Sequence, residues 1–167
     1  MGGKKSGKTT TLEILTRELT KRGYKIAVVK HVPEPNFTID TVGKDTWRYA
    51  QSGAKTVVAA SANEIATLEK APGDRSLRDV LQRCRNVNIV FLEGFRKLMA
   101  RDRSMPKIVV AKSEQDIEEA VENFQPILAF TGPYMPEKAN LKAPYIDVLK
   151  SGEKIADLVE EVAEKKP

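Results

Sequence analysis

Apolar residues recur along this chain in two alternating patterns. A spacing of three to four residues predicts five helices, over 9–22, 44–52, 76–85, 114–124 and 152–164. Short, continuously apolar runs predict five buried strands, at 26–29, 55–60, 87–92, 108–111 and 127–130, with 145–148 as a candidate last strand. Residues 64–69 fit either a strand that pairs with 55–60 or a helical turn. Strands that alternate with helices indicate an α/β fold with a mostly parallel sheet covered on both faces.

The helix over 76–85 has the sharpest predicted boundary. Ser76 is a favoured N-cap residue, and Asp79 follows at the third helical position. Leu77, Val80, Leu81 and Cys84 share one face of this helix, so Cys84 is interpreted as a core residue rather than a reactive thiol.

Composition excludes several classes of protein but does not identify the ligand. The 167 residues contain no long linker or repeat, so residues 1–167 are expected to form a single domain. A net charge of +5 suits an anionic ligand such as a nucleotide, a phosphorylated cofactor or nucleic acid. One cysteine excludes an intrachain disulfide and fits a cytoplasmic protein, and one histidine excludes a histidine-rich metal site. No apolar run is long enough to span a membrane.

Residues 2–9 match the phosphate-loop (P-loop) pattern G-x-x-x-x-G-K-[ST], directly ahead of a strongly amphipathic helix. Glycines let such a loop fold tightly, so that its backbone N–H groups converge on phosphate oxygens. Lys8 is expected to reach the β- and γ-phosphates, and Thr9 to offer its hydroxyl to Mg²⁺. Lys4 and Lys5 add positive charge. The competing interpretation is a glycine-rich N-terminus without fixed structure.

One part of the expected P-loop context is absent from the sequence. A P-loop normally follows a buried strand, whereas this sequence begins on the loop itself. We therefore expect a sheet that lacks its usual central first strand, with a start upstream of Met1 or a trimmed chain as the explanation. Losing such a strand costs about 1.5–3 kcal/mol for each large buried side chain removed.

Acidic residues follow two other predicted elements. The strand before Glu93 ends in this carboxylate, which is the arrangement that delivers an acid to the Mg²⁺ region opposite a P-loop. The alternative is a surface acid after a strand. The segment 30–45 carries Lys30, His31, Asp40 and Asp45, and either aspartate is a candidate for Mg²⁺ or the γ-phosphate. A helix-start acid favoured by the helix dipole is an equally good interpretation of Asp45.

These motifs together resemble the MobB family, GTP-binding proteins of molybdenum-cofactor biosynthesis. The resemblance rests on G-G-K-K-S-G-K-T-T, K-H at 30–31, F-T-I-D-T-V-G-K-D-T with W-R-Y-A-Q-S-G-A behind it, F-L-E-G-F-R, and M-P-K-I at 105–108. It runs from residue 2 to about residue 110. Pro33 and Pro35 stand where that family often shows histidines, so a role that needed those rings does not transfer.

The resemblance implies a P-loop fold, GTP with Mg²⁺ as ligands, weak GTPase activity and a homodimer. It also implies partnership with a MobA-type guanylyltransferase, with the molybdopterin cofactor as a further candidate ligand and nucleic acid not expected. By position, the phosphates would be held by Gly3, Lys4, Lys5, Ser6, Gly7, Lys8, Thr9 and Thr10. Lys30 and His31 would line the site. The catalytic residues would be Asp45 and Glu93, and the metal ligands Thr9, Asp45 and Glu93.

Guanine selectivity rests on the resemblance alone. The sequence contains no N-K-x-D box, whose aspartate would hydrogen-bond the base. The segment 130–133, after a late strand, is by its place the expected base pocket.

Two other functions compete with this one. A small-molecule kinase would use the same loop together with an arginine-bearing lid, and the basic segment 96–106, predicted to be irregular, holds Arg96, Lys97, Arg101 and Arg103. A non-enzymatic module for an acidic partner would need no P-loop, so it predicts that Lys8→Ala leaves activity intact.

Overall fold

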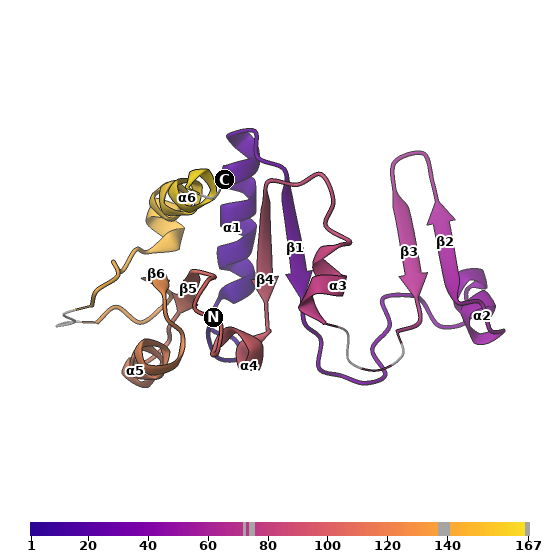
Figure 1. The fold of residues 1–167 in the computed structure, drawn as a ribbon, viewed down its shortest axis with the longest axis horizontal. Coiled ribbons are helices and arrows are strands. Elements are labelled where there is room, and N and C mark those ends of the chain that lie inside the picture. The colour runs from indigo at the N-terminus through magenta and orange to yellow at the C-terminus, as the bar shows by residue number, and fades with distance from the viewer. Residues whose placement is uncertain (72, 74–75, 137–140, 166–167) are drawn as a thin grey trace. The chain divides into compact units, whose positions relative to one another are not determined.

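A computed structural model describes residues 1–71, 73, 76–136 and 141–165 (Figure 1). The chain divides into two compact units, which are described separately. The first unit comprises Met1–His31 and Cys84–Pro167, and the second comprises Val32–Arg83. No helix in the described part of the chain is both long and apolar enough to cross a bilayer.

The first unit alternates helices and parallel strands, as the sequence predicts. Its elements are α1 (Lys8–Lys21), β1 (Ile26–Lys30), β4 (Ile89–Glu93), α4 (Arg96–Met99), β5 (Lys107–Val110), α5 (Glu114–Asn123), β6 (Ile127–Thr131) and α6 (Val148–Glu164). β1 pairs in parallel with β4, and β5 pairs in parallel with β6. The predicted α/β class with parallel strands is confirmed.

Met1 lies along the edge of β5 that faces away from β6. Its amino group donates a hydrogen bond to the Ile108 carbonyl, and the Val110 N–H donates to the Met1 carbonyl at 2.7 Å. A residue in a neighbouring parallel strand makes this pair of bonds. Among the described residues no ladder joins β4 to β5, so the strands form two parallel pairs rather than one continuous sheet.

Helix α1 packs on α6 and on the strands of the first unit. Leu15 and Leu19 are fully buried on the face of α1 that contacts Ile155 and Ala156 of α6. Gly152 lies at the crossing, where an added Cβ would come within 2.5 Å of Ile14 Cγ2. The close approach of the two helices therefore depends on a residue without a side chain.

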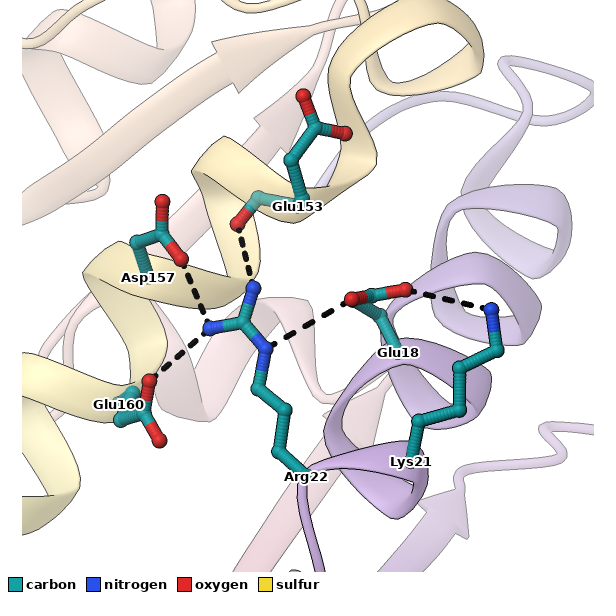
Figure 2. Close-up of polar contacts among 6 residues, drawn as sticks. All are labelled: Glu18, Lys21, Arg22, Glu153, Asp157 and Glu160. Atoms are coloured by element: carbon teal, nitrogen blue, oxygen red, sulfur yellow. Dashed lines mark hydrogen bonds and ion pairs between the residues drawn. The ribbon is translucent and has the colours of Figure 1, made fainter.

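Arg22 fixes the far end of the α1–α6 contact (Figure 2). Its guanidinium lies 2.8 Å from Asp157 and 2.9 Å from Glu160, and it donates to the Glu153 carbonyl at 3.2 Å. The hydrogen bond with Asp157 is the main reason that the pKa of Arg22 is raised. This network sits at the opposite end of α1 from the P-loop.

The second unit comprises α2 (Asp45–Gln51), β2 (Thr56–Ala60), β3 (Ile65–Glu69) and α3 (Leu77–Leu81). β2 and β3 form an antiparallel pair, so residues 64–69 resolve as a strand. The predicted capping box is present, because the Ser76 hydroxyl accepts from the Asp79 N–H at 3.2 Å and the Asp79 carboxylate accepts from the Ser76 N–H.

Three predicted elements differ from the structure. The helix predicted over 76–85 ends at Leu81, and Cys84, expected in the core, is only partly buried. The segment predicted to be irregular contains α4, whose Met99 is buried in the first unit. The candidate strand 145–148 is wrong apart from one isolated bridge at Tyr145, because the Asp147 side chain accepts from the Leu149 N–H and starts α6.

Candidate phosphate-binding site

The loop 2–7 is a tight turn held against the end of β5. Lys5 and Gly7 have left-handed backbone angles, with φ of 55° and 98°, and Gly7 is the residue on which α1 begins. A Cβ added to Gly2 would lie 2.4 Å from the Val110 carbonyl oxygen, so only glycine fits there. The loop thus has the compact form that backbone binding of an anion requires.

The start of α1 supplies donors to the loop. The first N–H groups of a helix have no partner within the helix, and they carry the positive end of its dipole. Here they belong to the first residues of a 14-residue helix that follows Gly7 directly, and Thr9 and Thr10 in this turn are exposed. This geometry favours a phosphate group over the loop.

Lys8 folds back across the loop and donates a hydrogen bond from Nζ to the Gly3 carbonyl. Burial lowers the pKa of Lys8, while Glu93 opposes that shift and Lys30 reinforces it. A partly desolvated ammonium close to one carboxylate interacts strongly with an incoming phosphate.

The Ser6 side chain lies inside the loop, and the part of Ser6 in holding phosphate stays a prediction. Its side chain is buried, its Oγ makes no hydrogen bond in the described structure, and it lies 2.7 Å from the Cβ position of Gly2. The hydroxyl therefore packs inside the loop, and only the Ser6 backbone N–H remains suited to a ligand. Lys4 and Lys5, by contrast, are exposed on the outside of the loop.

The carboxyl ends of β1 and β4 bring Lys30, His31 and Glu93 together. Lys30 is in register with Glu93, and the His31 N–H donates to the Glu93 carbonyl at 2.8 Å. The His31 ring contacts the Phe95 ring, with centroids 5.3 Å apart. Gly94 is needed at this contact, because its Cβ would lie 3.0 Å from the His31 carbonyl oxygen. Glu93 is also close enough to Lys8 to influence its pKa.

Two residues near the loop, Lys112 and Asp116, were not predicted from the sequence, and Arg96 was considered there only as part of a kinase lid. Arg96 and Asp116 both affect the pKa of Lys8, and the side chain of Lys112 lies against Gly3. Arg96 also pairs with Glu119 and stacks 4.8 Å from the Phe124 ring centre. Their place in the sequence could have indicated them, since each follows β4 or β5 at the edge where the carboxyl ends of the strands meet.

Asp45 belongs to the second unit, so its role beside the P-loop stays a prediction. It is exposed at the start of α2, where its carboxylate lies 3.7 Å from Arg48. The Asp40 side chain in the same unit is held by two hydrogen bonds. Its Oδ1 accepts from the Thr41 N–H at 2.8 Å and from the Thr46 hydroxyl at 2.9 Å. Its Oδ2 is buried and makes no hydrogen bond within the described residues.

The side chains near the loop suit Mg²⁺, which is held partly by water and phosphate, better than a metal ion that needs protein ligands alone. In the described part of the chain, no three His, Cys, Asp or Glu side chains gather in a way that would hold a metal ion. Mg²⁺ commonly keeps several waters and uses one or two carboxylates together with substrate phosphates. The Thr9 hydroxyl and the Glu93 carboxylate, the ligands expected from the sequence, would form such a partial set, and a Mg²⁺ held by them would neutralise phosphate charge.

The family model for MobB, described as molybdopterin guanine dinucleotide synthesis protein B, matches residues 1–132. This chain belongs to the MobB family. It is 33% identical over 111 residues to a molybdopterin-guanine dinucleotide biosynthesis adapter protein of Haemophilus influenzae, covering 65% of this chain and 59% of the relative. An adapter protein of the same name from Escherichia coli is 27% identical over 95 residues, 54% of each chain. This MobB chain therefore spans little more than half the length of these curated relatives.

One solved structure supports the same assignment, and a second supports the fold. A crystal structure of molybdopterin-guanine biosynthesis protein B superposes with a TM-score of 0.74 and 25% identity, covering 99% of this chain and 97% of the other. A MobB homologue from Bacillus stearothermophilus superposes with a TM-score of 0.70 and 24% identity, covering 98% and 95%. The second likeness supports the fold alone.

Proposed function

We propose that this MobB chain binds GTP with Mg²⁺ through residues 2–10, hydrolyses it slowly, and serves as a cytoplasmic adapter in the synthesis of molybdopterin guanine dinucleotide. The tight loop that starts α1, with Lys8 folded back across it, carries the proposal. Thr9 and Glu93 hold Mg²⁺, and Lys30 and His31 line the γ-phosphate side. The part of Asp45, which belongs to the second unit, stays a prediction from the sequence.

The adapter role rests on the family and on the names of its relatives. The partner proposed for this chain is a MobA-type guanylyltransferase, which attaches GMP to molybdopterin. A homodimer is also proposed. It is supported by the large apolar side chains that the second unit leaves exposed, which are Phe37, Ile39, Val42, Tyr49, Val58 and Ile65.

The kinase alternative receives less support. A lid must move over the phosphates, whereas the start of the basic segment is anchored within the first unit. Arg96 pairs with Glu119 on α5 and stacks on Phe124, and Met99 is buried. Phosphate transfer to an added small-molecule acceptor would favour the kinase, and slow phosphate release to water favours the adapter.

Calorimetric titration with GTP and with ATP, each with Mg²⁺, tests nucleotide binding. The unmodified chain is compared with Lys8→Ala and with Lys21→Ala, a lysine on the same helix at the end far from the loop. Removing a charge-assisted contact with phosphate should weaken GTP binding by about tenfold to a hundredfold in Lys8→Ala, and Lys21→Ala should match the unmodified chain. A parallel series carries a strand-forming segment fused ahead of Met1.

Each part of the proposal can fail separately. If neither nucleotide binds in either series, nucleotide binding is wrong. If Lys8→Ala binds GTP normally and keeps its adapter activity, the chain is a binding module that does not use the P-loop. Light scattering of the chain alone and with a purified guanylyltransferase tests the homodimer and the partner independently.

A further inference from the structure

The carboxyl end of β5 borders the P-loop directly. The residue before the loop is hydrogen-bonded to β5, and Gly2 packs against the Val110 carbonyl. The residues that follow β5, Ala111 to Glu114, therefore leave the strand beside the loop. In open parallel sheets, ligands lie at this edge.

Lys112 lies over Gly3 of the loop. A Cβ built at Gly3 would be 3.6 Å from Lys112 Cε and 3.9 Å from Lys112 Nζ, which is ordinary van der Waals contact. Asp116 fixes the turn that carries this lysine, because its Oδ2 accepts from the Lys112 N–H at 2.9 Å. The Asp116 N–H in turn donates to the Ser113 hydroxyl at 3.3 Å. The methylene stem of Lys112 is thereby presented from an ordered turn next to the phosphate site.

The end of β6 closes the neighbouring side of this turn. Gly132 packs so closely on Ala111 that a Cβ there would lie 2.3 Å from the Ala111 carbonyl oxygen. The Tyr145 hydroxyl donates to the Gly132 carbonyl, and the Val148 N–H donates to the buried Thr131 hydroxyl at 3.1 Å. The Thr131 hydroxyl is engaged within the core and is not free for a base, and the segment 130–133 stays the base pocket expected from the sequence.

The two sides of the P-loop differ in chemistry. Glu93 and Lys30 lie on the side of β4 and β1, where a γ-phosphate and Mg²⁺ are proposed to sit. A triphosphate is a linear chain, so its nucleoside end lies away from that side. The ordered surface there is the turn after β5.

We infer that Lys112 and Glu114 form the nucleobase subsite and that Glu114 selects guanine, an inference that rests on the proposed nucleotide binding. Glu114 is the first residue of α5, is exposed, and has no partner among the described residues. A carboxylate accepts two hydrogen bonds side by side, and guanine presents two donors, N1–H and the 2-amino group, on one edge. Adenine presents the acceptor N1 at that edge, which a carboxylate repels. The stem of Lys112 packs on the face of the base.

Calorimetry with GTP, ATP and xanthosine triphosphate, each with Mg²⁺, tests this on the unmodified chain, Glu114→Gln and the matched control Glu118→Gln. Glu118 is an exposed glutamate on the same helix, one turn further on. We expect Glu114→Gln to lose about tenfold or more in GTP affinity, with ATP affinity no lower than in the unmodified chain, because the repulsion of adenine N1 is removed. Xanthosine triphosphate should bind this variant better than the unmodified chain, because the new amide donates to the 2-oxo group of xanthine.

The outcomes separate this inference from the proposed function. If the unmodified chain binds GTP but Glu114→Gln keeps its preference over ATP and gains nothing for xanthosine triphosphate, the assignment of Glu114 is wrong and nucleotide binding stands. The same holds if Glu118→Gln shows the same loss as Glu114→Gln. If the unmodified chain binds none of the three triphosphates, the proposed function fails, and the base subsite fails with it.

Discussion

The two units of this chain differ in how many apolar side chains they bury. The first unit buries two apolar clusters, one around Leu15 and Ile155 and one around Val109 and Phe130. In the second unit, Val57 is the one buried apolar residue among those the structure describes. The P-loop belongs to the unit with the core, so its geometry is fixed by packing. The second unit presents apolar side chains that a partner or a second copy would cover.

The largest expected contrast between the units is the cost of removing an apolar side chain. Leu15→Ala should lower the free energy of unfolding by about 3–5 kcal/mol, because it leaves a cavity in a closed core. Val58→Ala, at a site 58% exposed in the second unit, should cost less than about 0.5 kcal/mol in the monomer. Urea denaturation at low protein concentration measures both. Equal losses would show that the second unit has a core of its own.

A pair of glycines tests the same comparison at the backbone. Both Gly2 and Gly53 have positive φ, at 149° and 106°, but an added Cβ meets the Val110 carbonyl at 2.4 Å in the first case and nothing within 4 Å in the second. Gly2→Ala should therefore cost about 1–3 kcal/mol from overpacking in addition to strain, and Gly53→Ala about 1 kcal/mol from strain alone.

Gly2→Ala should also weaken GTP binding, because the loop must shift away from β5. Thermal unfolding and calorimetry of the two variants check the two effects. A Gly2→Ala protein with unchanged stability and affinity would mean that the loop is not held by β5.

The sequence predicted the local elements of the first unit better than its long-range contacts. The P-loop, α1 and the strand before Glu93 follow from short-range patterns, since each is set by its own residues. The places of Lys112 and Asp116 do not follow from such patterns. They depend on which strand lies beside the loop, and that pairing is decided by contacts more than 100 residues apart in the chain, such as the one between Met1 and Ile108.

The prediction that Cys84 lies in the core was wrong for a different reason. Helical spacing indicated a core face for the segment 76–85, but Leu77, Val80, Leu81 and Cys84 on that face are each only partly buried. Periodicity shows which side chains share a face, but not how much of the protein lies beneath them.

The pH dependence of nucleotide binding should distinguish the site from the surface lysines. Burial lowers the pKa of Lys8 in the free protein, and a bound triphosphate raises it again, so the complex holds a proton that the free protein loses. GTP affinity should therefore be full below the lowered pKa of Lys8. It should fall as the pH rises through that value, by at most about tenfold for each pH unit.

Calorimetry between pH 7 and pH 10 measures this slope. Lys8→Arg provides the control, because a guanidinium stays charged over the whole range and should remove most of the slope. A slope that persists in Lys8→Arg would assign the titration to another group.

The smallest expected contrast concerns ion pairs. In the first unit Arg22 meets Asp157, Glu160 and the Glu153 carbonyl with only 21% of its side chain exposed (Figure 2). In the second unit Arg83 meets Glu69 with 54% of its side chain exposed.

Arg22→Met keeps the stem over α6 but removes the charge, and it should cost about 1 kcal/mol, because two carboxylates lose their shared donor. Arg83→Met should cost about 0.5 kcal/mol or less, as expected for an exposed pair. Urea denaturation at 0.05 M and 1 M salt separates the two, because screening should erase the Arg83 effect and leave most of the Arg22 effect. If salt erases both, the α1–α6 contact is held by Leu15, Leu19 and Ile155 alone, and the network of Arg22 adds nothing to the core of the first unit.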